Sequence, residues 1–189
     1  YLLHPSDYWH AATPAPEYLA EAIDIQIFSD EGSLRRAVTD QGTGNDAYIG
    51  QDLGNENLGV INDPQLLAYM DFHRACKTDY ELELMRRASE VGVRGHMAAQ
   101  AAFKDGASEY HIHMAFLTAS AQTDLELPYG NIVALNEHGA TLHYQRQERE
   151  TPKEIRSLLI DAGGNYQGYA SDITRTYVAA GNQHKAFAA

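Results

Sequence analysis

Two aspartates on either side of a glycine-rich stretch are the feature that most constrains how this chain can fold. Asp161 and Asp172 lie eleven positions apart in the segment LLIDAGGNYQGYASDITRTY. An apolar run, a glycine-rich stretch and a second run rich in Thr and Tyr predict a β-hairpin over residues 157–177. With its turn at Tyr166 and Gln167, this hairpin would place Asp161 directly opposite Asp172.

Such a pair of carboxylates needs a compensating charge, because like charges directly opposite each other destabilise a sheet. A divalent metal ion between them would supply it, since hard cations prefer carboxylate oxygens as ligands. A single proton shared by the two carboxylates, or a register that separates them, would also relieve the repulsion. The spacing therefore predicts a metal site at Asp161 and Asp172 and leaves these two alternatives open.

Composition narrows the class of protein. The formal net charge of −12 over 189 residues argues against nucleic acid or an anionic membrane as partner, because both need basic patches. The single cysteine, Cys76, excludes an internal disulfide framework and favours a reducing compartment. No apolar stretch approaches the roughly 20 residues that span a bilayer, and no signal-peptide pattern opens the chain. We expect a cytoplasmic protein.

Two differently patterned segments predict two domains. Residues 1–74 alternate short strand and helix signals, among them a period-two run at residues 23–28 and a helix with Pro64 in its first turn, and they predict an α/β unit. Residues 75–189 begin with a capping box at Thr78 and Glu81, which starts a long helix.

The second segment continues with a shorter helix after Ser108 and then with predicted strands at residues 131–135 and 141–145 and the aspartate hairpin. Two helices followed by antiparallel strands predict an α+β fold. The chain has no initial Met and stops shortly after a strand. Both features suggest a segment of a longer protein.

Other candidate residues lie near the hairpin in sequence. His143, on the predicted strand 141–145, could be a metal ligand, a general acid or a substrate contact, or simply a half-exposed strand residue. Thr174 shares the strand face of Asp172 and could orient that carboxylate, although Thr is also a good strand former. His138 falls in a predicted turn, where we expect it to be solvated.

Several separated motifs in the same order resemble the prolidases and aminopeptidase P, and in particular the bacterial Xaa-Pro dipeptidase branch, which includes the organophosphorus acid anhydrolases. The motifs are residues 7–10 (DYWH), 77–88 (KTDYELELMRRA), 127–137 (LPYGNIVALNE), 142–144 (LHY), 159–163 (LIDAG) and 168–176 (GYASDITRT).

This resemblance implies a two-domain organisation. Residues 1–74 would be the C-terminal part of an N-terminal α/β domain, and residues 75–189 the first half of a "pita-bread" metallopeptidase domain with a binuclear metal site. Asp161 would chelate one metal ion and Asp172 would bridge both. Members of the family usually hold two Mn²⁺ ions, with Co²⁺ or Zn²⁺ as alternatives, and commonly form homodimers.

The resemblance also implies an activity. The enzyme would be a metal-dependent Xaa-Pro dipeptidase that cleaves dipeptides with a C-terminal proline through a hydroxide activated by two metal ions, with a possible side activity on organophosphate esters. His143 would contact the substrate or the transition state, and Tyr129 and Leu142 would line the small substrate pocket.

The sequence departs from the family pattern at its end. The family completes the site with one histidine and two glutamates further along, so this chain would hold two of five protein ligands. Two alternatives therefore stay open: another pita-bread hydrolase of the aminopeptidase P type, or a catalytically incomplete segment that serves as a binding or structural module.

Overall fold

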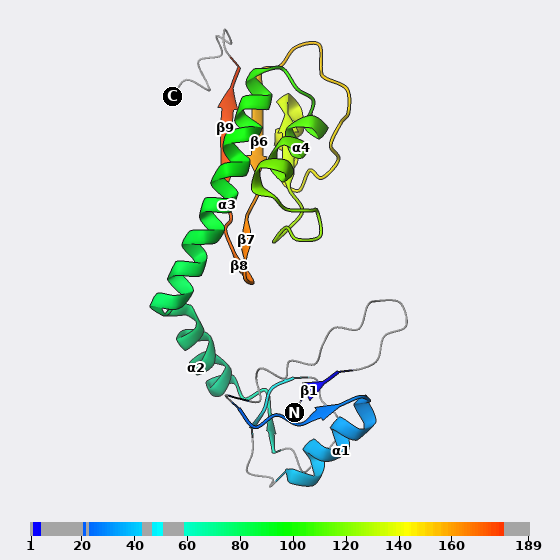
Figure 1. Cartoon of the computed structure of the whole chain (residues 1–189), viewed down its shortest axis with the longest axis vertical. Helices are drawn as coiled ribbons and strands as arrows, with labels where there is room; N and C mark the ends of the chain where they lie inside the picture. Colours follow the sequence, from blue (N-terminus) through cyan, green and yellow to red (C-terminus); the bar gives the residue numbers. More distant parts are fainter. Residues whose placement is uncertain (1, 5–20, 22, 43–46, 51–58, 180–189) are drawn as a thin grey trace. The chain divides into compact units, whose positions relative to one another are not determined.

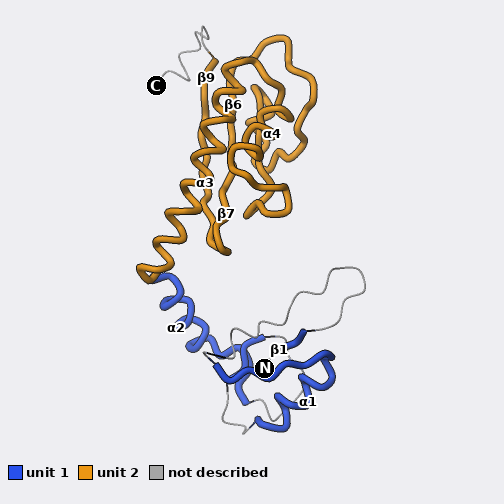
Figure 2. The backbone as a smooth tube through the Cα atoms, in the orientation of Figure 1, with its two compact units in different colours: residues 1–76 blue, residues 77–189 orange. Residues whose placement is uncertain are grey.

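The computed structural model describes residues 2–4, 21, 23–42, 47–50 and 59–179, which fall into two compact units. Figure 2 colours the units, residues 1–76 and residues 77–189. The division lies two residues after the predicted domain boundary, and the assignment of each unit to a domain of the family stays a prediction. The motif at residues 7–10 lies outside the described residues.

The described residues of the first unit form short parallel strand pairs and two α-helices (Figure 1). Strand β1 (Leu2–Leu3) pairs with β2 (Ile27–Phe28), and β3 (Ala47–Tyr48) pairs with β4 (Val60–Ile61). The helices are α1 (Glu31–Gln41) and α2 (Pro64–Ala75). Parallel pairing together with helices is the arrangement expected of an α/β unit. The strand predicted at residues 23–28 is limited to β2.

Both helices of this unit start at an aspartate. The side chain of Asp30 accepts a hydrogen bond from the Ser33 amide, and that of Asp63 accepts from the amide of Leu66, each at 2.8 Å. An N-cap carboxylate satisfies amide groups that have no partner within the helix. Pro64 follows its cap directly, at a position where the missing N–H costs nothing.

The second unit opens with α3 (Asp79–Lys104) and α4 (Glu109–Ser120). The predicted capping box is confirmed: the Glu81 amide lies 3.3 Å from the Thr78 hydroxyl, and the Thr78 amide donates to Glu81 at 2.7 Å. A Cβ on Gly95 would lie 2.5 Å from the ring of Phe116. Glycine at this position therefore allows α4 to approach α3 closely.

A three-stranded antiparallel sheet completes the unit, in the order β5 (Ile132–Leu135), β6 (Ser157–Asp161) and β9 (Thr174–Val178). Between β6 and β9, the short strands β7 (Asn165–Tyr166) and β8 (Tyr169–Ala170) form the tip of a hairpin. Buried residues from both helices and from β5 and β6 make one hydrophobic cluster, including Phe103, Ile112, Phe116, Val133, Leu158 and Ile160. The α+β fold predicted for this segment is confirmed.

The predicted hairpin exists, but its predicted register is wrong. Asp161 pairs with Thr174, not with Asp172. The turn lies at Gln167 and Gly168, whose φ angles of 49° and 83° are both positive. A two-residue turn with this backbone suits the twist of antiparallel strands and favours glycine at its second position, so the turn lies one residue later than predicted.

The strand predicted at residues 141–145 is also wrong. After β5, the 3₁₀ helix η3 (Asn136–Ala140) begins, and residues 141–156 form no strand. The chain leaves the sheet at Asn136, where φ is 56°. The Asn136 side chain accepts from the Arg156 amide at 2.7 Å and donates to the Glu154 carbonyl at 2.8 Å. These bonds fasten the two ends of the β5–β6 loop together.

No helix among the described residues is both long enough and apolar enough to cross a membrane.

Candidate metal centre

The carboxylates of Asp161 and Asp172 converge on one hydroxyl group. The Tyr129 oxygen lies 2.8 Å from Asp161 Oδ1 and 3.0 Å from Asp172 Oδ1. Asp161 ends β6, while Asp172 lies two residues before Thr174, the partner of Asp161. Because side chains alternate with a period of two, the corrected register keeps both carboxylates on the same face of the hairpin.

The Tyr129 phenol alone does not compensate the negative charge of the two carboxylates. A phenol has one proton, so Tyr129 donates to one carboxylate at a time. Burial first, and then the bonds to Asp161 and Asp172, raise the pKa of Tyr129, so the hydroxyl stays protonated and remains a donor. Two carboxylate oxygens around a single proton form a donor set that suits a hard divalent cation.

These residues form only part of a metal site. Within the described part of the chain, no group of three or more His, Cys, Asp or Glu side chains could hold a metal ion. Asp161 is half-buried and Asp172 is exposed, so the carboxylates lie at the edge of the unit. The two aspartates thus fit a divalent cation and leave most of its coordination positions to other ligands.

The backbone beneath Asp172 is held against α3. The hydroxyl of the buried Ser171 donates to the Ala88 carbonyl at 3.0 Å and accepts from the Gly164 amide at 2.9 Å. A Cβ on Gly163 would lie 2.0 Å from the Ser171 carbonyl oxygen, which leaves no room for a side chain there. Glycine at this position therefore permits the strand approach that brings Asp172 beside Asp161.

His96 supports the neighbouring strand, a role that the sequence did not reveal. Its Nε2 donates to the carbonyl of Ala162, the residue after Asp161, at 3.0 Å. Burial lowers the pKa of His96, so the ring is neutral and packs edge-on against Phe116. Its helical spacing from Ala88 and Phe103 on the buried face of α3 was the available signal.

In the part of the chain that the structure describes, the other predicted site residues make no hydrogen bond to the carboxylates, although Thr174 is the strand partner of Asp161. Leu142 is 84% exposed and His143 is exposed, both on the loop between β5 and β6. Thr174 is opposite Asp161 and exposed. No hydrogen bond of the described residues joins any of these three side chains to Asp161 or Asp172. The structure therefore brings together Tyr129, Asp161 and Asp172 and leaves His143 and Leu142 on a separate loop.

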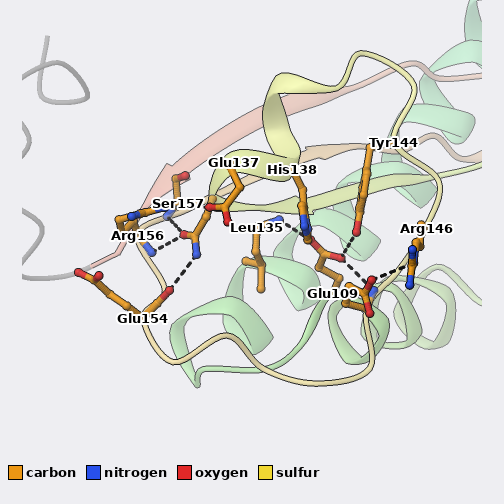
Figure 3. Close-up of polar contacts among 11 residues, drawn as sticks. Glu109, Leu135, Glu137, His138, Tyr144, Arg146, Glu154, Arg156 and Ser157 are labelled. Atoms are coloured by element: carbon orange, nitrogen blue, oxygen red, sulfur yellow. Dashed lines mark hydrogen bonds and ion pairs between the residues drawn. The ribbon is translucent and has the colours of Figure 1, made fainter.

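The expectation that His138 is solvated is met only in part, because its side chain is 40% exposed and also contacts Glu109. Figure 3 shows its ring directed at Glu109, and Nδ1 lies 2.7 Å from Glu109 Oε1. Glu109 is the first residue of α4, where an acidic side chain is expected to face water and to interact with the helix dipole. Its burial depends on the loop that folds over it, so the local sequence carried no signal for it.

Comparison with known proteins identifies the family. A model of metallopeptidase family M24 matches residues 83–189, more than half of the chain. The protein therefore belongs to metallopeptidase family M24, whose peptidases depend on divalent metal ions.

Individual relatives within this family are also similar to the chain. The Xaa-Pro dipeptidase of Pectobacterium carotovorum is 47% identical over 182 residues, which cover 93% of this chain and 41% of that protein. The Xaa-Pro dipeptidase of Stenotrophomonas maltophilia is 48% identical over 188 residues, covering 98% and 42%. The chain thus spans about two fifths of the length of these relatives.

A solved structure shows the same fold. Escherichia coli aminopeptidase P superposes with a TM-score of 0.71 at 22% identity, covering 94% of this chain and 46% of that one. The pita-bread fold that the sequence predicted is therefore confirmed.

Proposed function

We propose that the protein hydrolyses Xaa-Pro dipeptides in a metal-dependent reaction. Membership of family M24 and relatives named Xaa-Pro dipeptidase at 47–48% identity support this activity. The observation that carries the proposal is the convergence of Asp161 and Asp172 on the Tyr129 hydroxyl. Two carboxylates in this arrangement are what a dipeptidase of a metal-dependent family would need at its centre.

The proposed cofactor is a pair of divalent metal ions, with Asp161 holding one and Asp172 shared by both. The oxygen-only donors that this chain contributes favour Mn²⁺ over the softer Co²⁺ and Zn²⁺. When bound, such ions polarise a carbonyl group and lower the pKa of a water molecule to near neutrality.

The chain's own residues would bind and orient the substrate. Tyr129, protonated because its pKa is raised, would hold the carboxylates in place and line the pocket. Leu142, an exposed apolar side chain, would cover the proline ring. His143 would donate a hydrogen bond to the oxygen of the scissile carbonyl as negative charge develops on it, and Thr174 would orient Asp172.

Several further properties belong to the same proposal. The substrate would be a small dipeptide with a C-terminal proline, and the whole protein would act as a cytoplasmic homodimer. The net charge of −12 disfavours nucleic acid and membranes as partners. Organophosphate esters would be a side activity, because a tetrahedral phosphorus centre resembles the intermediate of amide hydrolysis.

The test is an Asp172→Asn substitution in the whole protein loaded with Mn²⁺. We expect the release of proline from an Xaa-Pro dipeptide to be abolished and at least one metal ion per site to be lost, as measured by elemental analysis. His143→Ala should lower turnover by about 10²- to 10³-fold and keep both ions.

The matched control is Asp105→Asn, which removes an exposed carboxylate at the end of α3 and should change neither quantity. Full activity of the Asp172→Asn variant would overturn the site assignment. Cleavage of Xaa-Pro-Yaa tripeptides without cleavage of Xaa-Pro dipeptides would identify an aminopeptidase P-type enzyme instead.

A further inference from the structure

Glu109 is 1% exposed, and its carboxylate accepts four hydrogen bonds, one for each of its lone-pair positions. Oε1 accepts from the Leu135 amide at 2.8 Å and from His138 Nδ1 at 2.7 Å. Oε2 accepts from the Tyr144 hydroxyl at 2.7 Å and from the Glu148 amide at 2.9 Å. The carboxylate is thus saturated with donors.

All four donors belong to the end of β5 and the loop that follows it. Figure 3 labels Leu135, His138 and Tyr144 near Glu109. The rings of His138 and Tyr144 stack with centroids 4.7 Å apart, and the Tyr110 amide donates to the Glu148 carbonyl at 3.1 Å. The loop is therefore fastened on both sides of residues 142 and 143, although those residues themselves are exposed.

The base of the same loop is fixed independently of Glu109. Asn136 accepts from the amides of Arg156 and Ser157 at 2.7 and 3.3 Å, close to the start of β6. Loss of the Glu109 bonds would therefore leave the loop anchored at its ends and loosen its middle, residues 138–148. Those residues would keep the bond from the Tyr110 amide to the Glu148 carbonyl and the bond from Gln145 to the Gly130 carbonyl.

We propose that Glu109 is a positioning residue: it sets the place of His143 and Leu142 in the proposed dipeptidase site without touching substrate. This inference rests on the proposed function. The role requires a carboxylate, because all four partners are donors and a glutamine has one acceptor oxygen. In a Glu109→Gln variant, the amide nitrogen faces a backbone N–H of Leu135 or Glu148, which accepts no hydrogen bond.

The kinetic test is a double-mutant cycle in the metal-loaded whole protein with an Xaa-Pro dipeptide. Glu109→Gln should lower kcat by about 10- to 100-fold, as expected for a displaced catalytic group, with the Mn²⁺ content unchanged. If Glu109 acts through His143, adding Glu109→Gln to His143→Ala should lower kcat by less than about 2-fold. Losses that multiply in the double variant would overturn the inference.

Glu150→Gln is the matched control, since Glu150 is an exposed carboxylate on the same loop. We expect it to leave kcat and metal content at wild-type values. A loss in this variant as large as that in Glu109→Gln would mean that any charge change in the loop lowers activity, and would contradict a specific role for Glu109.

A second measurement needs no activity. Amide hydrogen exchange, followed by mass spectrometry, should speed up at residues 138–148 in Glu109→Gln while α3 and α4 keep their protection. Tyr144→Phe removes one of the four bonds and should give a smaller change at the same residues, which keeps the test decisive if Glu109→Gln does not fold. Unchanged exchange in the loop overturns the positioning role. Absence of hydrolysis by the wild-type protein would instead contradict the proposed function.

Discussion

The helices of the two units begin in the same way but differ in how many of their residues are buried. Side chains of Asp30 and Asp63 cap α1 and α2, and Thr78 caps α3 with the same kind of bond to an amide. Yet neither α1 nor α2 has a buried residue, whereas eight residues of α3 are buried. A good helix start therefore indicates where a helix lies and not whether it supports a core.

The polar contacts of the two units differ in range as well. The ion pair between Glu31 and Arg35 in α1 joins exposed side chains one turn apart. In the second unit, Tyr129 reaches Asp161 and Asp172 across 32 and 43 positions of the chain. The buried core of the second unit holds these distant segments together, and the candidate metal centre is in that unit.

The largest test of this contrast is a matched pair of Leu→Ala substitutions. Replacing Leu158, which is fully buried in β6, with alanine should lower the free energy of unfolding by about 2–5 kcal/mol. Replacing Leu34, which is half-buried in α1, with alanine should lower it by less than about 1.5 kcal/mol. Urea titration with amide hydrogen exchange as the readout measures the unfolding of each unit separately. Equal losses would show that the first unit has a core of similar strength.

A pair of Gly→Ala substitutions sharpens the same contrast, with the larger loss of stability expected in the second unit. Alanine at Gly95 would place a Cβ 2.5 Å from the Phe116 ring, and the overpacking should cost about 1–3 kcal/mol. Alanine at the exposed Gly32 of α1 should change stability by no more than about 1 kcal/mol, because helix propensity favours it while its Cβ would lie 3.3 Å from the capping Asp30 Oδ1. Thermal unfolding of each variant measures both. Stabilisation by Gly95→Ala would contradict the close packing of α3 on α4.

The smallest expected effect concerns acid titration. The Thr78 amide, followed by the Tyr169 hydroxyl, lowers the pKa of Glu81 to about 2. Because the folded pKa is depressed, the stabilisation is complete above the ordinary value of about 4.5 and is lost as the pH falls through about 2. In α1, the pKa of Asp30 is lowered chiefly by its bond to the Ser33 amide.

The Tyr169→Phe substitution should change the pKa of Glu81 and leave that of Asp30 as it is. Side-chain NMR titration should show a higher pKa for Glu81, because the variant removes the hydroxyl that donates to it at 2.7 Å. The titration of Asp30 should stay the same, since its partners are within its own helix. An unchanged titration of Glu81 would mean that the hairpin tip does not hold it.

Much of this fold was predictable from short windows of sequence. The capping box at Thr78 and the helix beginning at Pro64 follow from residues within a turn of each other. The α+β order follows from the succession of such local patterns along the chain. Part of the site was predictable too, since Asp161 and Asp172 were selected as a pair. Their pairing register was not, because the difference between two adjacent turn positions depends on which residues tolerate a positive φ.

The sequence by itself determined the start points of the helices, the existence of the hairpin and the placement of two aspartates on one face of it. Each of these depends on hydrogen bonds or side-chain alternation between near neighbours. Only the tertiary structure decided that Tyr129 bridges the two carboxylates, that His96 bonds to the carbonyl of the residue after Asp161 and that Glu109 is buried beneath a loop. Those contacts join residues 32 or more positions apart in the first two cases, and the third depends on a loop folding over a helix terminus. Local patterns carry no information about such approaches, since packing of the whole unit determines them.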